Sequence, residues 1–136
     1  MDLRKSVQRQ TDVALNITKH LFSKDEYHDK NLIFSPFSLH AALSVMAAGA
    51  HGRTLDELLS FLRFDSIDHL ITFFSRLISA LFYDVDAPSH HLSFVNGMWV
   101  DNSLSISHSF KQLVATQYKA TLASADFQYE VLSRFL

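Results

Sequence analysis

The residues of this chain that could do chemistry are first of all its histidines, because imidazole binds metals and transfers protons. Eight histidines occur, at His20, His28, His40, His51, His69, His90, His91 and His108. No H-E-x-x-H motif is present, and no two histidines are four residues apart. No helix face therefore gathers a pair of ligands. His90 and His91 are neighbours in a predicted loop, where adjacent side chains point apart. We expect no metal site.

Serine is the second candidate, as a nucleophile. Ser35, Ser38 and Ser44 lie close together in the sequence, but no G-x-S-x-G motif surrounds them. A structural interpretation is stronger: Ser35 caps a helix, and Ser38 is a small polar residue facing a packed interior, where its hydroxyl should be hydrogen-bonded. We predict no catalytic residue and no enzyme activity.

The remaining motifs are weak. The segment "GAHG" lacks the lysine and the spacing of a phosphate-binding loop, and no cofactor site is evident. Asn16-Ile17-Thr18 matches the pattern for N-glycosylation but lies in a predicted helix, and we expect it to stay unmodified. Cysteine is absent, so the sequence contains neither a disulfide nor a thiolate ligand.

Composition excludes several classes of partner. The 136 residues are 48% apolar and 19% charged, with a formal net charge of −2, which is compatible with a folded core. No cluster of lysine and arginine would attract nucleic acid or an anionic membrane. No apolar run is long enough to span a membrane, and the first residues do not resemble a secretory signal peptide. The sequence predicts a soluble, cytoplasmic protein.

The periodicity of apolar residues predicts the elements that position these groups. Helices are expected over 3–22, 36–48, 54–62, 67–82 and 107–119, and strands over 31–34, 92–100 and within 123–128. This order is an α+β pattern dominated by helix. The first helix should bury a wide stripe formed by Val7, Val13, Ala14, Leu15, Ile17, Leu21 and Phe22.

Local signals mark the helix ends. Ser35 suits an N-cap and Pro36 the first helical position, while Gly49 suits a left-handed stop. Thr54 and Glu57 have the spacing of a capping box that would open the next helix.

The strand predicted over 92–100 is apolar at both alternating sets of positions, which suits a strand covered on both faces. Within it, Asn96-Gly97 indicates close backbone packing rather than a hairpin turn. The helix predicted over 36–48 is apolar on nearly every side and must be buried by something.

Three segments in order resemble the serpin family. "NLIFSPFSLHAALSVMAAGAHGRTLDELLSFL" resembles strand 6B and helices B and C, "LSFVNGMWVD" resembles strand 2A, and "SHSFKQLVATQYKATLASADFQ" resembles helix E and strand 1A. The segments "SFVNGMWVD" and "ADFQ" in particular resemble plant serpins. The resemblance covers about residues 5–128, and a divergent tail follows at 129–136.

The resemblance implies a partial serpin domain over 1–136: an α+β fold, mostly helical (helices A to E), with strands like 6B, 2A and 1A. It places Ser35 and Ser38 in the family's shutter region, beneath the point where the main sheet opens. It also assigns structural roles to Pro36, Gly49, Thr54, Asn96 and Trp99.

Serpins inhibit serine or cysteine proteases when a cleaved reactive-centre loop inserts into the main sheet. The resemblance ends before helix F and that loop, so we expect this chain to be non-inhibitory. Two alternatives remain open: an interaction module that binds a protease or another serpin through an exposed strand or helix, and a non-functional truncated gene product. Arg76 alone is basic on the helix over 67–82, so no heparin site is expected. The family also offers the extracellular space as an alternative location.

Overall fold

The computed structural model describes residues 2–27, 29–82 and 94–127. The chain divides into two compact units, Met1–Phe73 and Phe74–Leu136. The predicted loop at 84–91, which holds His90 and His91, lies outside the described residues, as do the start of the strand predicted from residue 92 and the tail at 129–136.

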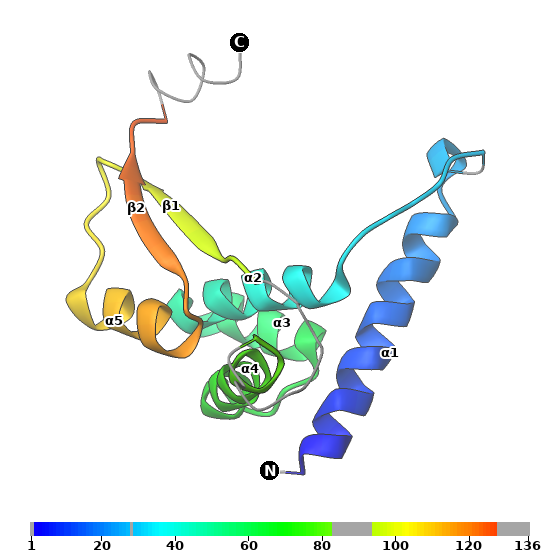
Figure 1. The fold of residues 1–136 in the computed structure, drawn as a ribbon, viewed down its shortest axis with the longest axis horizontal. Coiled ribbons are helices and arrows are strands. Elements are labelled where there is room, and N and C mark those ends of the chain that lie inside the picture. The colour runs from blue at the N-terminus through cyan, green and yellow to red at the C-terminus, as the bar shows by residue number, and fades with distance from the viewer. Residues whose placement is uncertain (1, 28, 83–93, 128–136) are drawn as a thin grey trace. The chain divides into compact units, whose positions relative to one another are not determined.

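The first unit is helical (Figure 1). Its elements are α1 (Leu3–Phe22), a 3-10 turn η1 (Asp25–Tyr27), α2 (Pro36–Gly49), α3 (Gly52–Leu62) and the first part of α4 (Ile67–Phe82), which continues into the second unit. The four helices predicted in this region are confirmed, with bounds that differ by at most two residues. Their periodic apolar residues carried enough information to locate them.

The stripe predicted to be buried on α1 is wrong in most of its members. Val7, Leu15 and Phe22 are exposed, and of the predicted stripe only Val13 is buried. The buried side of α1 instead combines Val13 with two polar residues, Ser6 and Gln10. Spacing alone does not tell which side of a helix meets a neighbour, because a helical stripe is buried only where another element covers it.

The strand predicted over 31–34 is not formed within the described residues. This segment is irregular and pairs with no other strand there, and the side chain of Ile33 is 94% exposed. A strand requires a neighbouring strand to satisfy its backbone groups, so β-rich composition alone cannot make one.

Helix α2 begins as predicted and ends differently. The Ser35 side chain caps it, and Pro36 is its first residue. Gly49 is the last helical residue rather than a left-handed stop, because Ala50 follows in an extended conformation with φ −90° and ψ 157°. The positive φ of this turn falls instead on Gly52, at 56°.

Helix α3 begins before Thr54, so the predicted capping box is wrong. Gly52 is its first residue, and the His51 side chain makes no capping hydrogen bond. Thr54 therefore lies inside the first turn, and Glu57 pairs with Arg53 at 2.8 Å instead of reaching back to a cap. The helix ends at Leu62, and the N–H of the following Arg63 bonds to the carbonyls of Leu59 and Ser60. Arg63 is left-handed (φ 58°, ψ 44°), which brings the Phe64 N–H to the Leu59 carbonyl at 3.0 Å.

An apolar cluster joins the end of α3 to the start of α4. Leu62, Phe64, Leu70 and Phe73 are all buried. The rings of Phe64 and Phe73 are tilted by 49° with their centroids 5.4 Å apart, an arrangement that aromatic pairs favour. This cluster gives the first unit a well-packed corner.

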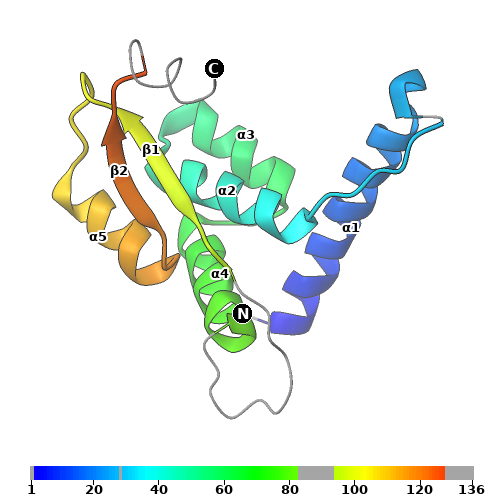
Figure 2. The same cartoon turned by 45° about the horizontal axis from the view of Figure 1, so that its top comes forward.

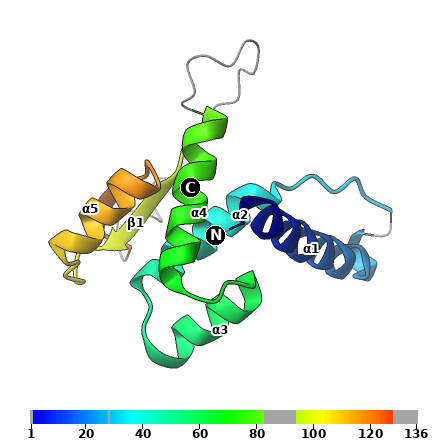
Figure 3. The same cartoon turned by 90° about the horizontal axis from the view of Figure 1, so that it is seen from below.

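The second unit contains a parallel pair of strands. Its elements after α4 are β1 (Gly97–Asp101), α5 (His108–Gln117) and β2 (Thr121–Ala125), with Gly97 opposite Thr121 and Asp101 opposite Ala125. Helix α5 is the crossover that parallel strands require, and it contacts β2 (Figure 2). Figure 3 shows α5 and β1 from below. The strand predicted within 123–128 is present but lies earlier, at Thr121–Ala125, so Asp126 and Phe127 are not part of it.

Helix α5 is anchored at both ends. The Ser107 hydroxyl accepts a hydrogen bond from the Phe110 N–H at 3.3 Å and caps the helix. Val114 and Tyr118 are fully buried. Lys119 then adopts φ 51°, and this left-handed turn reverses the chain into β2.

Strand β1 is shorter and more open than predicted. Among the described residues it begins at Gly97, since residues 94–96 are not paired as strand. Trp99 is 63% exposed, so β1 is not covered on both faces.

None of the described helices is long and apolar enough to cross a membrane.

Candidate functional site

Ser35 and Ser38 form a hydroxyl pair at the start of α2. The Ser35 oxygen accepts hydrogen bonds from the Ser38 N–H at 3.2 Å and from the Ser38 hydroxyl at 3.0 Å. Both residues are exposed, so the predicted packed interior around Ser38 is wrong for the described residues. The pair caps the helix, and no histidine or carboxylate of the described residues hydrogen-bonds to it as an activating base.

The opposite side of α2 buries polar groups. Ser44 is fully buried, and His40 is 4% exposed. The His40 Nε2 atom has no hydrogen-bond partner among the described residues. Burial lowers the pKa of His40 below its ordinary value of 6.5, because the charged imidazolium is poorly solvated there. The imidazole of His40 is therefore uncharged at neutral pH.

Between these two regions, α2 carries an exposed stripe without charge. Its members follow helical spacing: Ser38, Leu39, Ala42, Met46 and Gly49. Leu39 is 40% exposed and Met46 is 57% exposed. We call this set the α2 stripe. Apolar residues lie both on this exposed stripe and on the buried side of α2, so the helix is apolar on nearly every side.

At the start of β1, Trp99 folds back over Gly97. A Cβ atom on Gly97 would lie 2.6 Å from the Trp99 indole, so the ring occupies the space that a side chain would need. Gly97 therefore lies in strand β1 rather than in a turn, and the group that approaches it is the Trp99 side chain rather than another backbone. The side-chain nitrogen of Asn96 is buried without a partner among the described residues. The backbone carbonyl of Asn96 accepts a hydrogen bond from the Thr121 N–H at 3.0 Å.

Asp101 closes the other end of β1. One carboxylate oxygen accepts the N–H and the hydroxyl of Ser103, and the other accepts the Phe127 N–H at 3.1 Å. These bonds stabilise the charged form, with the Ser103 hydroxyl foremost, and hold the pKa of Asp101 below its ordinary value. Asp101 therefore links the turn after β1 to the end of β2 and needs no ligand to explain it.

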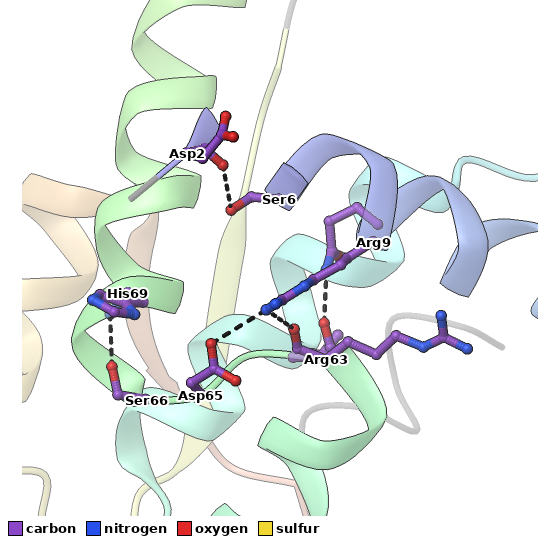
Figure 4. A network of polar contacts seen from close by, with 9 residues as sticks. Asp2, Ser6, Arg9, Arg63, Asp65, Ser66 and His69 are labelled. Carbon is purple, nitrogen blue, oxygen red and sulfur yellow. Dashed lines mark hydrogen bonds and ion pairs between the residues drawn. The ribbon is translucent and has the colours of Figure 1, made fainter. Parts of the chain in front are cut away.

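A polar junction that the sequence did not predict joins α1 to the end of α3. The Gln10 side chain donates a buried 2.7 Å hydrogen bond to the Leu62 carbonyl, one of the groups that a helix end leaves unpaired. Arg9 contacts the Arg63 carbonyl at 3.4 Å and Asp65 at 3.3 Å, as Figure 4 shows. Arg63 in turn pairs with Asp12 at 3.3 Å. The sequence held one signal for this junction. Gln10 lies three residues before the buried Val13 and therefore on the same face of the helix.

The predicted site residues fall into separate groups. The first unit contains Ser35, Pro36, Gly49 and Thr54, and Thr54 is exposed in the first turn of α3. The second unit contains Asn96 and Trp99. Among the described residues, no three histidine, aspartate or glutamate side chains are grouped so that they could hold a metal ion.

Comparison with known proteins identifies the fold. The family model for Serpin (serine protease inhibitor) matches residues 8–134. The chain belongs to the serpin family. Among curated serpins, Serpin-ZX of Arabidopsis thaliana is 45% identical over 129 residues, covering 94% of this chain and 33% of the relative. Serpin-Z1C of Triticum aestivum is 37% identical over 128 residues, covering 93% of this chain and 32% of the relative.

Solved serpin structures agree. The native stressed form of Arabidopsis AtSerpin1 superposes with a TM-score of 0.87 at 43% identity, covering 98% of this chain and 34% of that one. Human thyroxine-binding globulin superposes with a TM-score of 0.85 at 26% identity, covering 99% and 36%. The predicted serpin α+β fold is confirmed, and the chain spans about a third of the length of the serpins it matches.

Proposed function

We propose that these 136 residues do not inhibit a protease by themselves. Inhibition in this family works by insertion of a cleaved loop as a new strand in the main sheet. The observation that supports the proposal is the extent of the match, which covers about a third of each relative. The matched residues resemble the part of a serpin that precedes the reactive-centre loop.

The sheet in the second unit supports the same proposal. Loop insertion needs two neighbouring strands that can part to admit a third. The described residues form one two-stranded sheet, β1 and β2, joined directly through α5. Parting these strands would dismantle the only sheet that the described residues contain.

A protease panel tests this proposal. The purified chain is incubated with trypsin, chymotrypsin and papain, and the products are separated by denaturing electrophoresis. A full-length plant serpin serves as the positive control. We expect the proteases to keep full activity and no band at the summed mass of protease and chain. A denaturant-stable covalent complex would refute the proposal.

The α2 stripe favours a second candidate function, binding to a protein partner such as another serpin. Leu39 and Met46 together present an uncharged, apolar strip on one helix face. Contiguous apolar patches on a protein surface mark interaction sites. Such binding would use contact rather than chemistry.

Size-exclusion chromatography with a full-length plant serpin tests this second function. We expect the wild-type chain to co-elute with it, and Leu39→Glu with Met46→Glu to weaken this association at least ten-fold. Gln8→Glu with Asn16→Glu, at two exposed positions of α1, adds the same two charges elsewhere and should leave association unchanged. Equal behaviour of all three proteins would count against the α2 stripe.

A further inference from the structure

The end of α3 has carbonyl groups that the helix itself cannot pair. The Arg63 N–H bonds to the carbonyls of Leu59 and Ser60. The Phe64 N–H also bonds to the Leu59 carbonyl, at 3.0 Å. These bonds close the last turn of the helix, and they leave the carbonyls of Leu62 and Arg63 to partners outside α3.

Helix α1 supplies both of these partners. The Gln10 amide donates to the Leu62 carbonyl at 2.7 Å, in a buried hydrogen bond. The Arg9 guanidinium donates to the Arg63 carbonyl at 3.4 Å (Figure 4). Two adjacent residues of α1 therefore cap two consecutive carbonyls at the end of α3. Residues directly after a helix usually fill this role, whereas here a different helix fills it.

Two ion pairs fix the position of α1 on this helix end. Arg9 contacts Asp65, just beyond α3, at 3.3 Å, and Arg63 contacts Asp12 on α1 at 3.3 Å. Helix α1 thus gives the cation to one pair and the anion to the other. A shift of α1 along its axis by one turn, about 5.4 Å, would break both ion pairs and both capping bonds.

The capped carbonyls lie beside the apolar corner between α3 and α4. The Leu62 side chain is fully buried, and the buried Phe64 ring packs against Phe73 on α4. Displacement of α1 would leave the Leu62 carbonyl without its partner, and water would have to enter to replace the Gln10 amide. Water at this position would loosen the last turn of α3 and the packing of Phe64.

We propose that α1 is the C-terminal cap of α3, and that α1, the last turn of α3 and the start of α4 open and close as one conformational unit. In the closed state, Gln10 and Arg9 hold the carbonyls of α3. In the open state, α1 has left and the turn at Phe64 is loose. Any event that displaces α1 is thereby transmitted to the α3–α4 corner. This inference goes beyond the two proposed functions, because it involves neither protease inhibition nor the α2 stripe.

Hydrogen exchange at single amides tests the proposal, with Gln10→Ala as the variant that removes the buried cap. The amide of Phe64 reports on the last turn of α3, and the amide of Val13 reports on α1. We expect both to exchange about ten-fold faster in Gln10→Ala than in the wild type. Gln8→Ala makes the same change at an exposed position of α1, and this control should leave both rates unchanged. The Tyr118 amide, which bonds to the Val114 carbonyl in the second unit, is the internal reference.

A second measurement uses the wild-type chain alone and decides the matter if Gln10→Ala does not fold. At low urea concentrations, amides that are exposed by one opening event share one opening free energy. We expect a single value for Val13 and Phe64 that differs from the value for Tyr118. Added salt should accelerate exchange at Val13 and Phe64 together, because it screens the exposed ion pairs.

Three results would overturn the inference. The first is a different opening free energy for Val13 and for Phe64 in the wild type. The second is unchanged exchange at Phe64 in a folded Gln10→Ala chain. The third is an equal acceleration at Tyr118, because the substitution would then have lowered the stability of the whole chain rather than opened one unit.

Discussion

At the scale of single residues, burial decides what the polar groups of this chain can do. Gln10 is useful because its buried amide satisfies the Leu62 carbonyl at the end of α3. A buried hydrogen bond of this kind costs about 1–3 kcal/mol when one partner is left unpaired. The exposed ion pairs beside it, Arg9–Asp65 and Arg63–Asp12, contribute about 1 kcal/mol or less each.

His40 should make stability depend on pH. Its pKa is lowered in the folded chain, so the unfolded chain takes up a proton first as the pH falls. The free energy of unfolding should therefore decrease below about pH 6.5 and level off once the folded chain is also protonated. Urea titrations at several pH values measure this. His40→Gln removes the ionisation, and equal pH slopes in the two proteins would contradict the prediction.

Gly97→Ala should displace the Trp99 indole without unfolding the chain. The new methyl group would lie 2.6 Å from the ring, and the ring is free to move because it is largely exposed. We expect a change in tryptophan emission and a decrease of about 1 kcal/mol or less in the free energy of unfolding. Gly49→Ala, at the end of α2, is the control that should leave the emission unchanged. Unaltered emission in Gly97→Ala would show that the ring does not pack there.

At the scale of elements, helix ends are set by backbone conformation as much as by side chains. Helix α3 begins at Gly52 because glycine tolerates the φ of 56° that the turn from α2 requires. It ends where Arg63 accepts a left-handed conformation, which glycine more often adopts. Helix α2 has a conventional start, with a serine cap followed by proline.

Ser35→Ala should therefore weaken α2 more than Ser38→Ala. The first change removes the acceptor of two hydrogen bonds and should cost about 1 kcal/mol in unfolding free energy. The second removes only an exposed hydroxyl and should cost less than about 0.5 kcal/mol. Thermal or urea unfolding of both variants decides this. A larger loss in Ser38→Ala would reveal a stronger partner for its hydroxyl than Ser35.

At the scale of the whole molecule, this chain presents apolar surface on several separate elements. Leu15 on α1, Met46 on α2 and Trp99 on β1 are all more than half exposed. Complete burial of one such side chain is worth about 1.5–3 kcal/mol. The relatives are about three times as long, and additional chain or a partner could cover these positions.

We expect the isolated chain to be only marginally stable. Ordinary domains have a free energy of unfolding of about 5–15 kcal/mol. Leaving several large apolar side chains uncovered removes a comparable amount. Urea unfolding followed by circular dichroism should give less than about 5 kcal/mol, whereas a full-length plant serpin measured alongside should give more. A sharp transition well above that value would mean that the exposed residues do not limit stability.

The sequence by itself determined the helices, the serine–proline start of α2 and the family. Helical periodicity, capping residues and turn residues are local signals, and they survive in the order of the residues. The motifs around Pro36, Asn96 and Trp99 occur in the same order as in serpins, and this order carried the resemblance. Gly97 also disclosed its role, because a glycine within a strand pattern indicates a close approach.

Only the tertiary structure decided which faces are covered and which residues meet. The buried side of α1 uses Gln10 rather than the predicted apolar stripe, and residues 31–34 form no strand among the described residues. The cap that α1 places on the end of α3 became visible only once the two helices were packed together. Burial and strand pairing depend on neighbours distant in the sequence, so no local pattern of residues can specify them.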